Sequence, residues 1–241
     1  YMWKKIFTYL REKEVIAIGD FNQLPPVGYD YGFDFWDSSY FKEKFNYTKV
    51  VLQKNKRQND PFFWNLHEKI LNEEHIDFRK YFRGNFTETM ICFTRDMRER
   101  LNQYILNKRL PAEHIELKHL KLFKGCKIIA KKNMEDYCNN ELFKVKDFKV
   151  NDKEIEITIT SILRKKNIKI NYEDLSNFEY GYALTGHQVQ GATIHSPHTI
   201  VEYEHFHSSK EWKYVAFSRT SRKEYVNVIP NIKKYMDNNN L

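Results

Sequence analysis

Several side chains that could bind an anion lie close together in segment 182–194. The segment opens with small and apolar residues, as the end of a β-strand would. It then places Thr185, His187 and Gln190 beside Gly191. Because glycine has no Cβ, Gly191 lets the backbone approach a ligand closely. Taken alone, the segment is equally compatible with a packed strand that ends in polar residues.

A second segment, 214–220, is an apolar run that carries one arginine, Arg219, between the hydroxyl residues Ser218 and Thr220. A guanidinium stays protonated and presents a fork of donors, so it suits a phosphate better than lysine does. The simpler interpretation of Arg219 is a surface salt bridge, which contributes little to stability.

A third string, Gly19-Asp-Phe-Asn-Gln-Leu-Pro-Pro-Val27, lies far upstream. It follows the apolar run Val15–Ile18, which predicts a short, buried strand of the parallel kind. Residues after such a strand face the ligand crevice of an open α/β sheet, so Asp20 and Gln23 are expected at a functional position. The two prolines alone would favour a stiff surface turn. Together, the three strings are typical of the phosphate-sensing and DNA-coupling parts of a nucleic-acid motor.

The three strings resemble, in chain order, motifs III, V and VI of superfamily 1 DNA helicases of the RecD and Dda type (superfamily 1B). Between them, Arg57-Gln58 resembles motif IV, and the segment 91–96 resembles the start of the family's second motor domain. The resemblance covers most of the chain. Its most specific part is the nine-residue string that begins at Gly19.

The resemblance implies a nucleotide site for ATP and Mg²⁺. It gives catalytic roles to Gln23, Arg57 and Arg219. A glutamine amide can donate to a phosphate oxygen and accept from the attacking water without adding charge. Arginines in these positions offset the charge that develops on the transferred phosphoryl group. The residues that the resemblance places at the nucleotide are Gly19, Asp20, Gln23, Arg57, Gln190, Gly191 and Arg219. For Arg57 the alternative is a solvated basic turn.

The resemblance also implies contacts with single-stranded DNA through Thr94, Thr185 and His187. A threonine at a strand-to-helix junction can hold a phosphate, although Thr94 is almost as well explained as a plain helix N-cap. The segment departs from the family pattern at Gly186, where an apolar residue is usual, and at Gln188, where a basic one is usual. We therefore expect a weaker, less salt-sensitive grip on DNA. Asn102 resembles a family asparagine to which we assign no role.

The fold class implied is α/β. We expect the end of a first RecA-like domain over 1–60 and a second RecA-like, parallel-sheet motor domain (2A) over 61–241, with a β-rich insertion at about 118–178. The residues support several elements of this scheme. Met90–Thr94 predicts a buried strand, 96–108 an amphipathic helix, and the alternation in 154–160 a strand with one wet face. Asp60-Pro61 predicts a helix start, and 49–53 a further strand.

Composition limits the remaining possibilities. The 241 residues are 41% hydrophobic with 16% aromatic, which excludes a disordered tail, and the net charge of +8 suits a polyanionic partner. The three cysteines are an odd number without paired metal-binding spacing, which fits an intracellular, reducing compartment. No apolar run is long enough to span a membrane. The aromatic-rich stretch 29–45 could stack on bases, but core packing is the stronger interpretation. The histidines that follow the second motif have loose spacing and no nearby cysteine, so we predict no metal site.

No Gly-x-x-x-x-Gly-Lys-Ser/Thr loop occurs in the sequence, nor does an Asp-Glu pair at the end of an apolar strand. We therefore expect the Mg²⁺ ligands upstream of a chain that is a carboxyl-terminal part of a longer protein and hydrolyses no ATP alone. The favoured hypothesis is an ATP-dependent DNA helicase or translocase on single-stranded DNA, moving 5′ to 3′ and serving DNA replication or repair. The alternative is a non-catalytic nucleic-acid-binding scaffold derived from such a motor. A nuclease finds no support because the carboxylates are not clustered.

Overall fold

The computed structural model describes residues 2–10, 13–25, 38–45, 48–53, 55–58, 60–151 and 154–237. Its central element is a four-stranded parallel sheet in the order β11-β10-β1-β9. The strands are β1 (Met90–Cys92), β9 (Ala183–Thr185), β10 (His198–Val201) and β11 (Val226–Ile229). Every residue of the four strands is buried. Burial on both sides is expected for parallel strands covered by helices. The predicted parallel-sheet α/β fold is confirmed.

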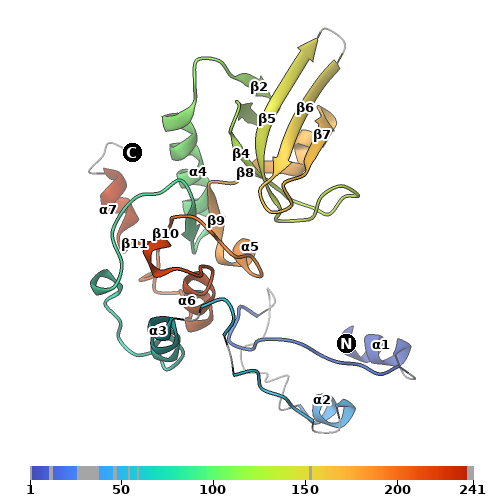
Figure 1. Ribbon diagram of the computed structural model, residues 1–241, viewed down its shortest axis with the longest axis vertical. Helices are drawn as coiled ribbons and strands as arrows, with labels where there is room; N and C mark the ends of the chain where they lie inside the picture. The colour runs from blue at the N-terminus through green and yellow to red at the C-terminus, as the bar shows by residue number, and fades with distance from the viewer. Residues whose placement is uncertain are drawn as a thin grey trace.

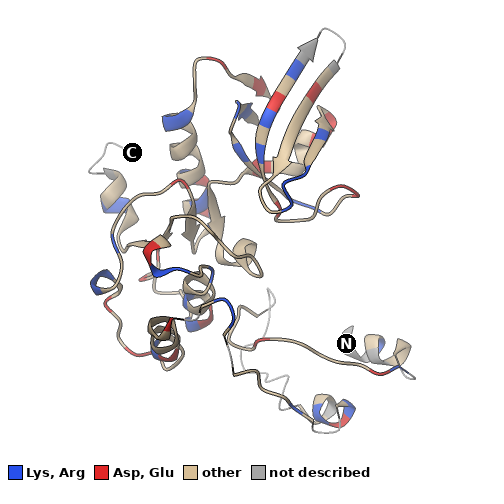
Figure 2. Cartoon of the chain, viewed as in Figure 1, with Lys and Arg blue, Asp and Glu red and all other residues tan. Residues whose placement is uncertain are grey.

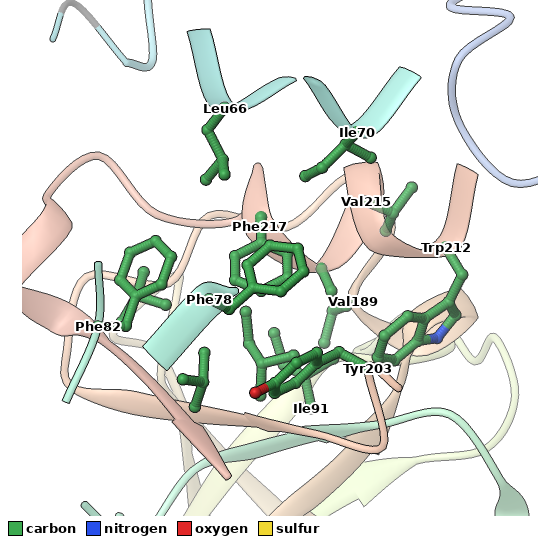
Figure 3. Close-up of a cluster of buried hydrophobic side chains, with 14 of the residues drawn as sticks. Leu66, Ile70, Phe78, Phe82, Ile91, Val189, Tyr203, Trp212, Val215 and Phe217 are labelled. Atoms are coloured by element: carbon green, nitrogen blue, oxygen red, sulfur yellow. The ribbon is translucent and has the colours of Figure 1, made fainter. Parts of the chain in front are cut away.

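Helices cover both faces of this sheet (Figure 1). One face packs against α3 (Pro61–Leu71), α5 (Gly186–Val189), α6 (Lys210–Phe217) and the 3-10 turn η1 (Phe78–Lys80). There the rings of Phe78 and Phe217 stack 4.4 Å apart (Figure 3). The other face packs against α4 (Arg95–Arg109) and α7 (Ile232–Asp237). The result is the three-layer arrangement of a RecA-like domain.

Local sequence signals explain where the helices begin. Asp60 caps α3 by accepting a hydrogen bond from the Phe62 amide at 2.9 Å, and Pro61 takes the first helical position, both as predicted. In α4, Thr94 is the N-cap, and Lys108 and Arg109 lie in the last turn, where they favour the helix dipole. The predicted strand at Met90 and the helix that follows it are therefore confirmed.

A second, antiparallel sheet interrupts the RecA-like domain between α4 and β9 (Figure 1). Its order is β7-β6-β5-β4-β8, beside a small hairpin of β2 (Ile115–Leu117) and β3 (Leu120–Leu122). The strands are β4 (Lys127–Ala130), β5 (Leu142–Asn151), β6 (Glu154–Ser161), β7 (Asn167–Asn171) and β8 (Phe178–Tyr180), with η2 (Glu173–Asn177) before β8. This sheet has its own core, which includes Phe143, Ile157 and Phe178. Figure 2 shows basic bands along β5.

Two predicted strands in the amino-terminal part are wrong. Val15–Ile18 and the segment 49–53 belong to no strand. Ile16 and Ile18 are 79% and 91% exposed, and Leu52 is 85% exposed. A strand requires a neighbour for its backbone hydrogen bonds, and neither segment pairs with a strand among the described residues. An apolar run alone therefore does not predict strand pairing.

The helices of this region, α1 (Met2–Tyr9) and α2 (Ser39–Lys44), lie apart from the parallel sheet (Figure 1). Much of the aromatic-rich stretch, 29–37, lies outside the described residues. None of the helices in the described part of the chain is long and apolar enough to cross a membrane.

Asn102 positions β9 against α4. Its Oδ1 atom accepts hydrogen bonds from the amides of Tyr182 and Ala183, both at 2.9 Å, and its Nδ2 group donates to the Ala183 carbonyl at 3.1 Å. These backbone groups are buried, so without the side chain they would lose their partners. This position gives the asparagine a structural role that the sequence left unassigned.

We predict that Asn102→Ala lowers the free energy of unfolding by about 2–4 kcal/mol, because it leaves buried backbone groups without partners. Urea unfolding followed by circular dichroism measures the change. The exposed neighbour Gln103→Ala, on the same helix, is the matched control and should change stability by less than about 0.5 kcal/mol. Equal effects of the two substitutions would contradict the role of Asn102.

Candidate functional site

The loop that follows Gly19 is attached to α6 through Asp20. One carboxylate oxygen of Asp20 accepts hydrogen bonds from the side-chain amide of Gln23 at 3.1 Å and from the Tyr214 hydroxyl at 3.2 Å. The other oxygen accepts from the backbone amide of Asn22 at 3.0 Å. Burial, followed by the Asp20 charge, raises the pKa of Tyr214 to about 12. Asp20 and Gln23 therefore lie together at the helix that precedes Arg219.

The Arg57-Gln58 turn contacts the carboxyl end of the same helix. The guanidinium of Arg57 donates to the Ser218 carbonyl at 3.1 Å, and the Gln58 amide donates to the Phe217 carbonyl at 3.1 Å. The Asn55 side chain shapes the turn by accepting from both backbone amides, each at 3.0 Å. Gln58 is fully buried, whereas Arg57 is half-buried. Residues about 160 positions apart are thus brought together.

Arg219 is the most buried charged residue of the site, with 1% of its surface exposed. Four of its five N–H donors are used within the protein. They contact the carbonyls of Val215 at 2.8 Å, Val189 at 3.4 Å and Ala192 at 3.4 Å, and the Ser218 hydroxyl at 2.6 Å. The resemblance places Arg219 at the nucleotide, and in this structure its guanidinium is packed under the surface.

The three segments meet at α6, where Asp20 contacts Tyr214 and Arg57 contacts Ser218. Burial first, and then the positive charge of Arg57, lower the pKa of Arg219 to about 10, while Tyr214 and Asp20 act in the opposite direction. Arg219 is therefore still charged at neutral pH. The arrangement brings two guanidinium groups and one carboxylate to the end of α6. Among the described residues, however, no second parallel sheet faces them.

Gln190 and Gly191 join the same region. The Gln190 amide donates to the Leu24 carbonyl at 3.4 Å, next to Gln23. Gly191 has φ of +85°, a conformation that other residues adopt at a cost, and so it turns the chain toward Arg219. Of the residues assigned to the nucleotide, all except Gly19 are placed here by a hydrogen bond or by the turn at Gly191. Gly19 has open space around its Cα and an exposed backbone.

His67, a buried residue of α3, lies in this region although the sequence did not assign it to the site. Its ring centroid is 4.9 Å from that of Tyr214, and 8% of its surface is exposed. Burial, and then the charge of Arg219, lower the pKa of His67 to about 4, and Asp20 opposes the shift. The apolar face formed by its helical neighbours predicted the burial. No sequence signal indicated that the face lies against Arg219.

Thr94 and the amino end of α4 hold a carboxylate from the protein itself. The Glu202 side chain accepts from the amides of Phe93 at 3.0 Å and Thr94 at 2.9 Å, and from the Thr94 hydroxyl at 2.9 Å. The Thr94 hydroxyl also caps the helix by accepting from the Met97 amide at 3.2 Å. The N-cap alternative is therefore confirmed. Glu202 was not anticipated, because nothing in its local sequence points to α4.

Thr185 is the N-cap of the short helix α5, and His187 lies in its first turn. Thr185 is buried and forms a capping box with Gln188, whose side-chain oxygen accepts from the Thr185 amide at 2.9 Å. The Gln188 amide in turn donates to Glu179 at 3.1 Å. His187 is exposed. Of the predicted DNA contacts, His187 alone presents its side chain freely to solvent.

The two departures from the family pattern have a structural explanation. A Cβ atom at Gly186 would lie 2.5 Å from the indole nitrogen of Trp212. The indole therefore leaves no room for a side chain at position 186. Gln188 replaces a basic residue, and its amide serves both Thr185 and Glu179. Arg98 supplies the positive charge beside Glu179 instead, at 2.7 Å.

The fold and these contacts define a RecA-like domain with an inserted antiparallel sheet. Its structural neighbours are Pif1 helicases, which belong to superfamily 1B. The enzyme from Candida albicans is similar with a TM-score of 0.66 and 19% identity over 92% of this chain and 67% of that protein. The Bacteroides enzyme in complex with ADP-AlF3 and ssDNA has a TM-score of 0.62 and 18% identity over 92% and 65%.

A third Pif1 helicase, from work on unwinding at forked double-stranded DNA, has a TM-score of 0.59 and 19% identity over 92% of this chain and 64% of that protein. This chain thus spans about two thirds of the length of the helicases that it resembles. The predicted resemblance to superfamily 1B is confirmed at the level of the fold. No family model matches the sequence, and no curated protein matches it.

The depressed pKa of His67 predicts an acid-sensitive site. Between pH 6.5 and about 4 the unfolded chain binds a proton at residue 67 that the folded chain excludes, so stability is present above this window and lost as the pH falls through it. We expect His67 to account for about 2 kcal/mol of destabilisation between about pH 7 and about pH 5.

Urea unfolding at these two pH values tests the expectation, with His67→Gln as the variant. The variant should lose about 2 kcal/mol less than the wild type, although buried His198, whose pKa burial also lowers, contributes in both proteins. An unchanged pH dependence in the variant would show that His67 is accessible to protons in the folded state.

Proposed function

We propose that this chain is the second motor domain of an ATP-dependent DNA helicase that moves along single-stranded DNA. The observation that carries the proposal is the convergence of three distant segments on the end of α6, through Asp20, Arg57 and Arg219. The fold, which it shares with Pif1 helicases, supports the same conclusion. The first motor domain, of which residues 1–60 would be the end, would supply the P-loop.

The residues at α6 fit the phosphates of ATP. Arg57 and Arg219 lie close enough for one charge to lower the pKa of the other, and such a pair of cations favours a polyanion between or beside them. Arg57, being half-buried, and the Gln23 amide would contact the ligand. Asp20 would hold Gln23 in place rather than touch a phosphate, because like charges repel. The Mg²⁺ ion would be held by carboxylates outside this chain.

The proposed mechanism uses these side chains as sensors. ATP supplies a phosphoryl group on which negative charge develops as it is transferred to water. Arg57 would offset that charge, and Gln23 would orient the water through its amide. Both residues are joined to α6, Gln23 by way of Asp20 and Tyr214 and Arg57 through Ser218. A shift at the nucleotide would therefore move α6 and the sheet behind it.

The proposed DNA contacts are Thr94, Thr185 and His187, which lie at or just after the carboxyl ends of β1 and β9. Two of the similar Bacteroides Pif1 structures contain ssDNA. The net charge of +8 favours a nucleic-acid backbone. We further propose 5′ to 3′ movement and a role in DNA replication or repair. In this proposal a DNA phosphate would replace the Glu202 carboxylate at the amino end of α4.

A non-catalytic nucleic-acid-binding scaffold is the second candidate. It is favoured by the burial of Arg219, whose donors already have partners within the protein, and by the occupied amino end of α4. DNA-stimulated ATP hydrolysis by the full-length natural protein distinguishes the two functions. Its absence, together with binding of single-stranded DNA, would establish the scaffold.

We predict that Arg57→Ala lowers DNA-stimulated ATP hydrolysis by the full-length protein about 100-fold or more, because it removes a charge that stabilises the transition state. Among the described residues the Arg57 side chain has one hydrogen bond, to the Ser218 carbonyl, whereas Arg219 has four, so Arg57 is the cleaner target. Lys56→Ala, the exposed basic neighbour, is the matched control and should leave turnover within about twofold. Similar losses in both variants would argue for a general charge effect.

We also predict that Glu202→Gln tightens the binding of single-stranded DNA by about three- to tenfold, because it removes the negative charge that competes with a phosphate at α4. Fluorescence anisotropy of a labelled oligonucleotide measures the affinity at fixed salt. Glu204→Gln changes the same charge two residues away, at an exposed position, and should have a smaller effect. Equal effects would show that α4 has no particular part in binding.

A further inference from the structure

A row of aromatic rings leads from the core to the surface beside the amino end of α4. The buried Trp212 meets Phe93 edge-on at 5.6 Å, and Phe93 lies 4.9 Å from His205. His205 stacks on Phe206 at 4.8 Å with 20° between the ring planes. The row continues to His207, whose centroid is 3.8 Å from that of Phe206. We call His205, Phe206 and His207 the aromatic step.

The step presents a large apolar ring to water. Phe206 is 84% exposed, which makes it one of the most exposed large hydrophobic residues among those described. Because so little of its ring is removed from water, Phe206 contributes little to the stability of the core. Its presence at the surface therefore has no explanation in the packing of the fold. Its neighbours hold it on two sides, and it is therefore supported as a platform rather than left as a free side chain.

The backbone of the turn is also fixed. Glu202 has φ of +58° and its carbonyl accepts from the His205 amide at 2.9 Å. The Ser208 amide donates to the His205 carbonyl at 2.8 Å, and its hydroxyl donates to the Tyr203 carbonyl at 3.0 Å. These bonds hold the chain on both sides of Phe206. A ligand would meet a surface whose shape is already set, which lowers the entropic cost of binding.

The step is linked by packing contacts to both predicted phosphate contacts. Glu202, in the same turn, reaches the amides of Phe93 and Thr94. On the other side, Trp212 packs directly against Gly186, the residue before His187. One continuous set of contacts thus joins the aromatic step to Thr94 and to His187.

We propose that the aromatic step stacks an unpaired nucleobase of the strand whose phosphates lie along Thr94 and His187. The proposal rests on the proposed function in that it requires binding of single-stranded nucleic acid. Every base has a flat π-face, so such a contact tolerates any sequence. In a duplex both faces of each base are covered by its neighbours. The step therefore selects single strands over duplexes, which phosphate contacts alone do not.

The test compares the binding of two labelled oligonucleotides of equal length, poly-dT and an abasic analogue with the same phosphates but no bases. Phe206→Leu keeps an apolar side chain and removes the ring. It should weaken dT binding by about 5- to 100-fold, the range expected for loss of one base–aromatic stack, and leave abasic binding unchanged. Phe206→Trp should retain dT binding and show quenching of the added indole fluorescence.

The matched control is Trp64→Leu, which removes a partly exposed aromatic ring from α3 and should leave both affinities unchanged. If wild type binds dT and Phe206→Leu binds it equally well, the step has no stacking role and the proposed function stands. If Phe206→Leu weakens the dT and abasic oligonucleotides alike, the residue acts on the fold or on phosphates, and stacking is wrong. If wild type binds neither oligonucleotide, both proposals are wrong.

Discussion

The structure around the site depends on how the buried, charged guanidinium of Arg219 is hydrogen-bonded within the protein. Removing such a charge from water costs several kcal/mol unless hydrogen bonds replace the lost solvation. Here the carbonyls of α6 and of the chain after α5 supply them. These two elements follow different strands of the parallel sheet, so the guanidinium holds their ends together. Arg57 and Asp20 then contact the same helix end from the amino-terminal part of the chain.

A second consequence of this packing is that the protein satisfies its own anion-binding positions. The amino end of α4 holds Glu202, and the Thr185 amide holds Gln188. A phosphate at either place would exchange one acceptor for another rather than fill an empty site. The net gain of such an exchange is smaller than that of a new charge-assisted bond. Phe206 is instead largely exposed, so a base that stacks on it would not have to displace a group of the protein. Such a contact would add to binding where the phosphate contacts add little.

Much of the fold could be predicted from local patterns. The cap at Asp60, the strand at Met90 and the helix after Thr94 were found because each depends on residues within a few positions of one another. The strand predicted at Val15–Ile18 failed for the opposite reason, since an apolar run becomes a strand only when another strand lies beside it. At the site, the types of residue were recognisable, but His67 and Glu202 were missed because their partners are distant in sequence.

The sequence by itself determined several helices and strands, the positive charge and the set of polar residues that could meet a phosphate, because these follow from composition and short-range spacing. The tertiary structure alone decided which of those residues face solvent and which are already bonded. Arg219 and Thr185 became buried, Arg57 and His187 stayed accessible, and Phe206 was left at the surface. The physical reason is that burial and hydrogen-bond partners are properties of segments brought together from far apart, and no local pattern contains them.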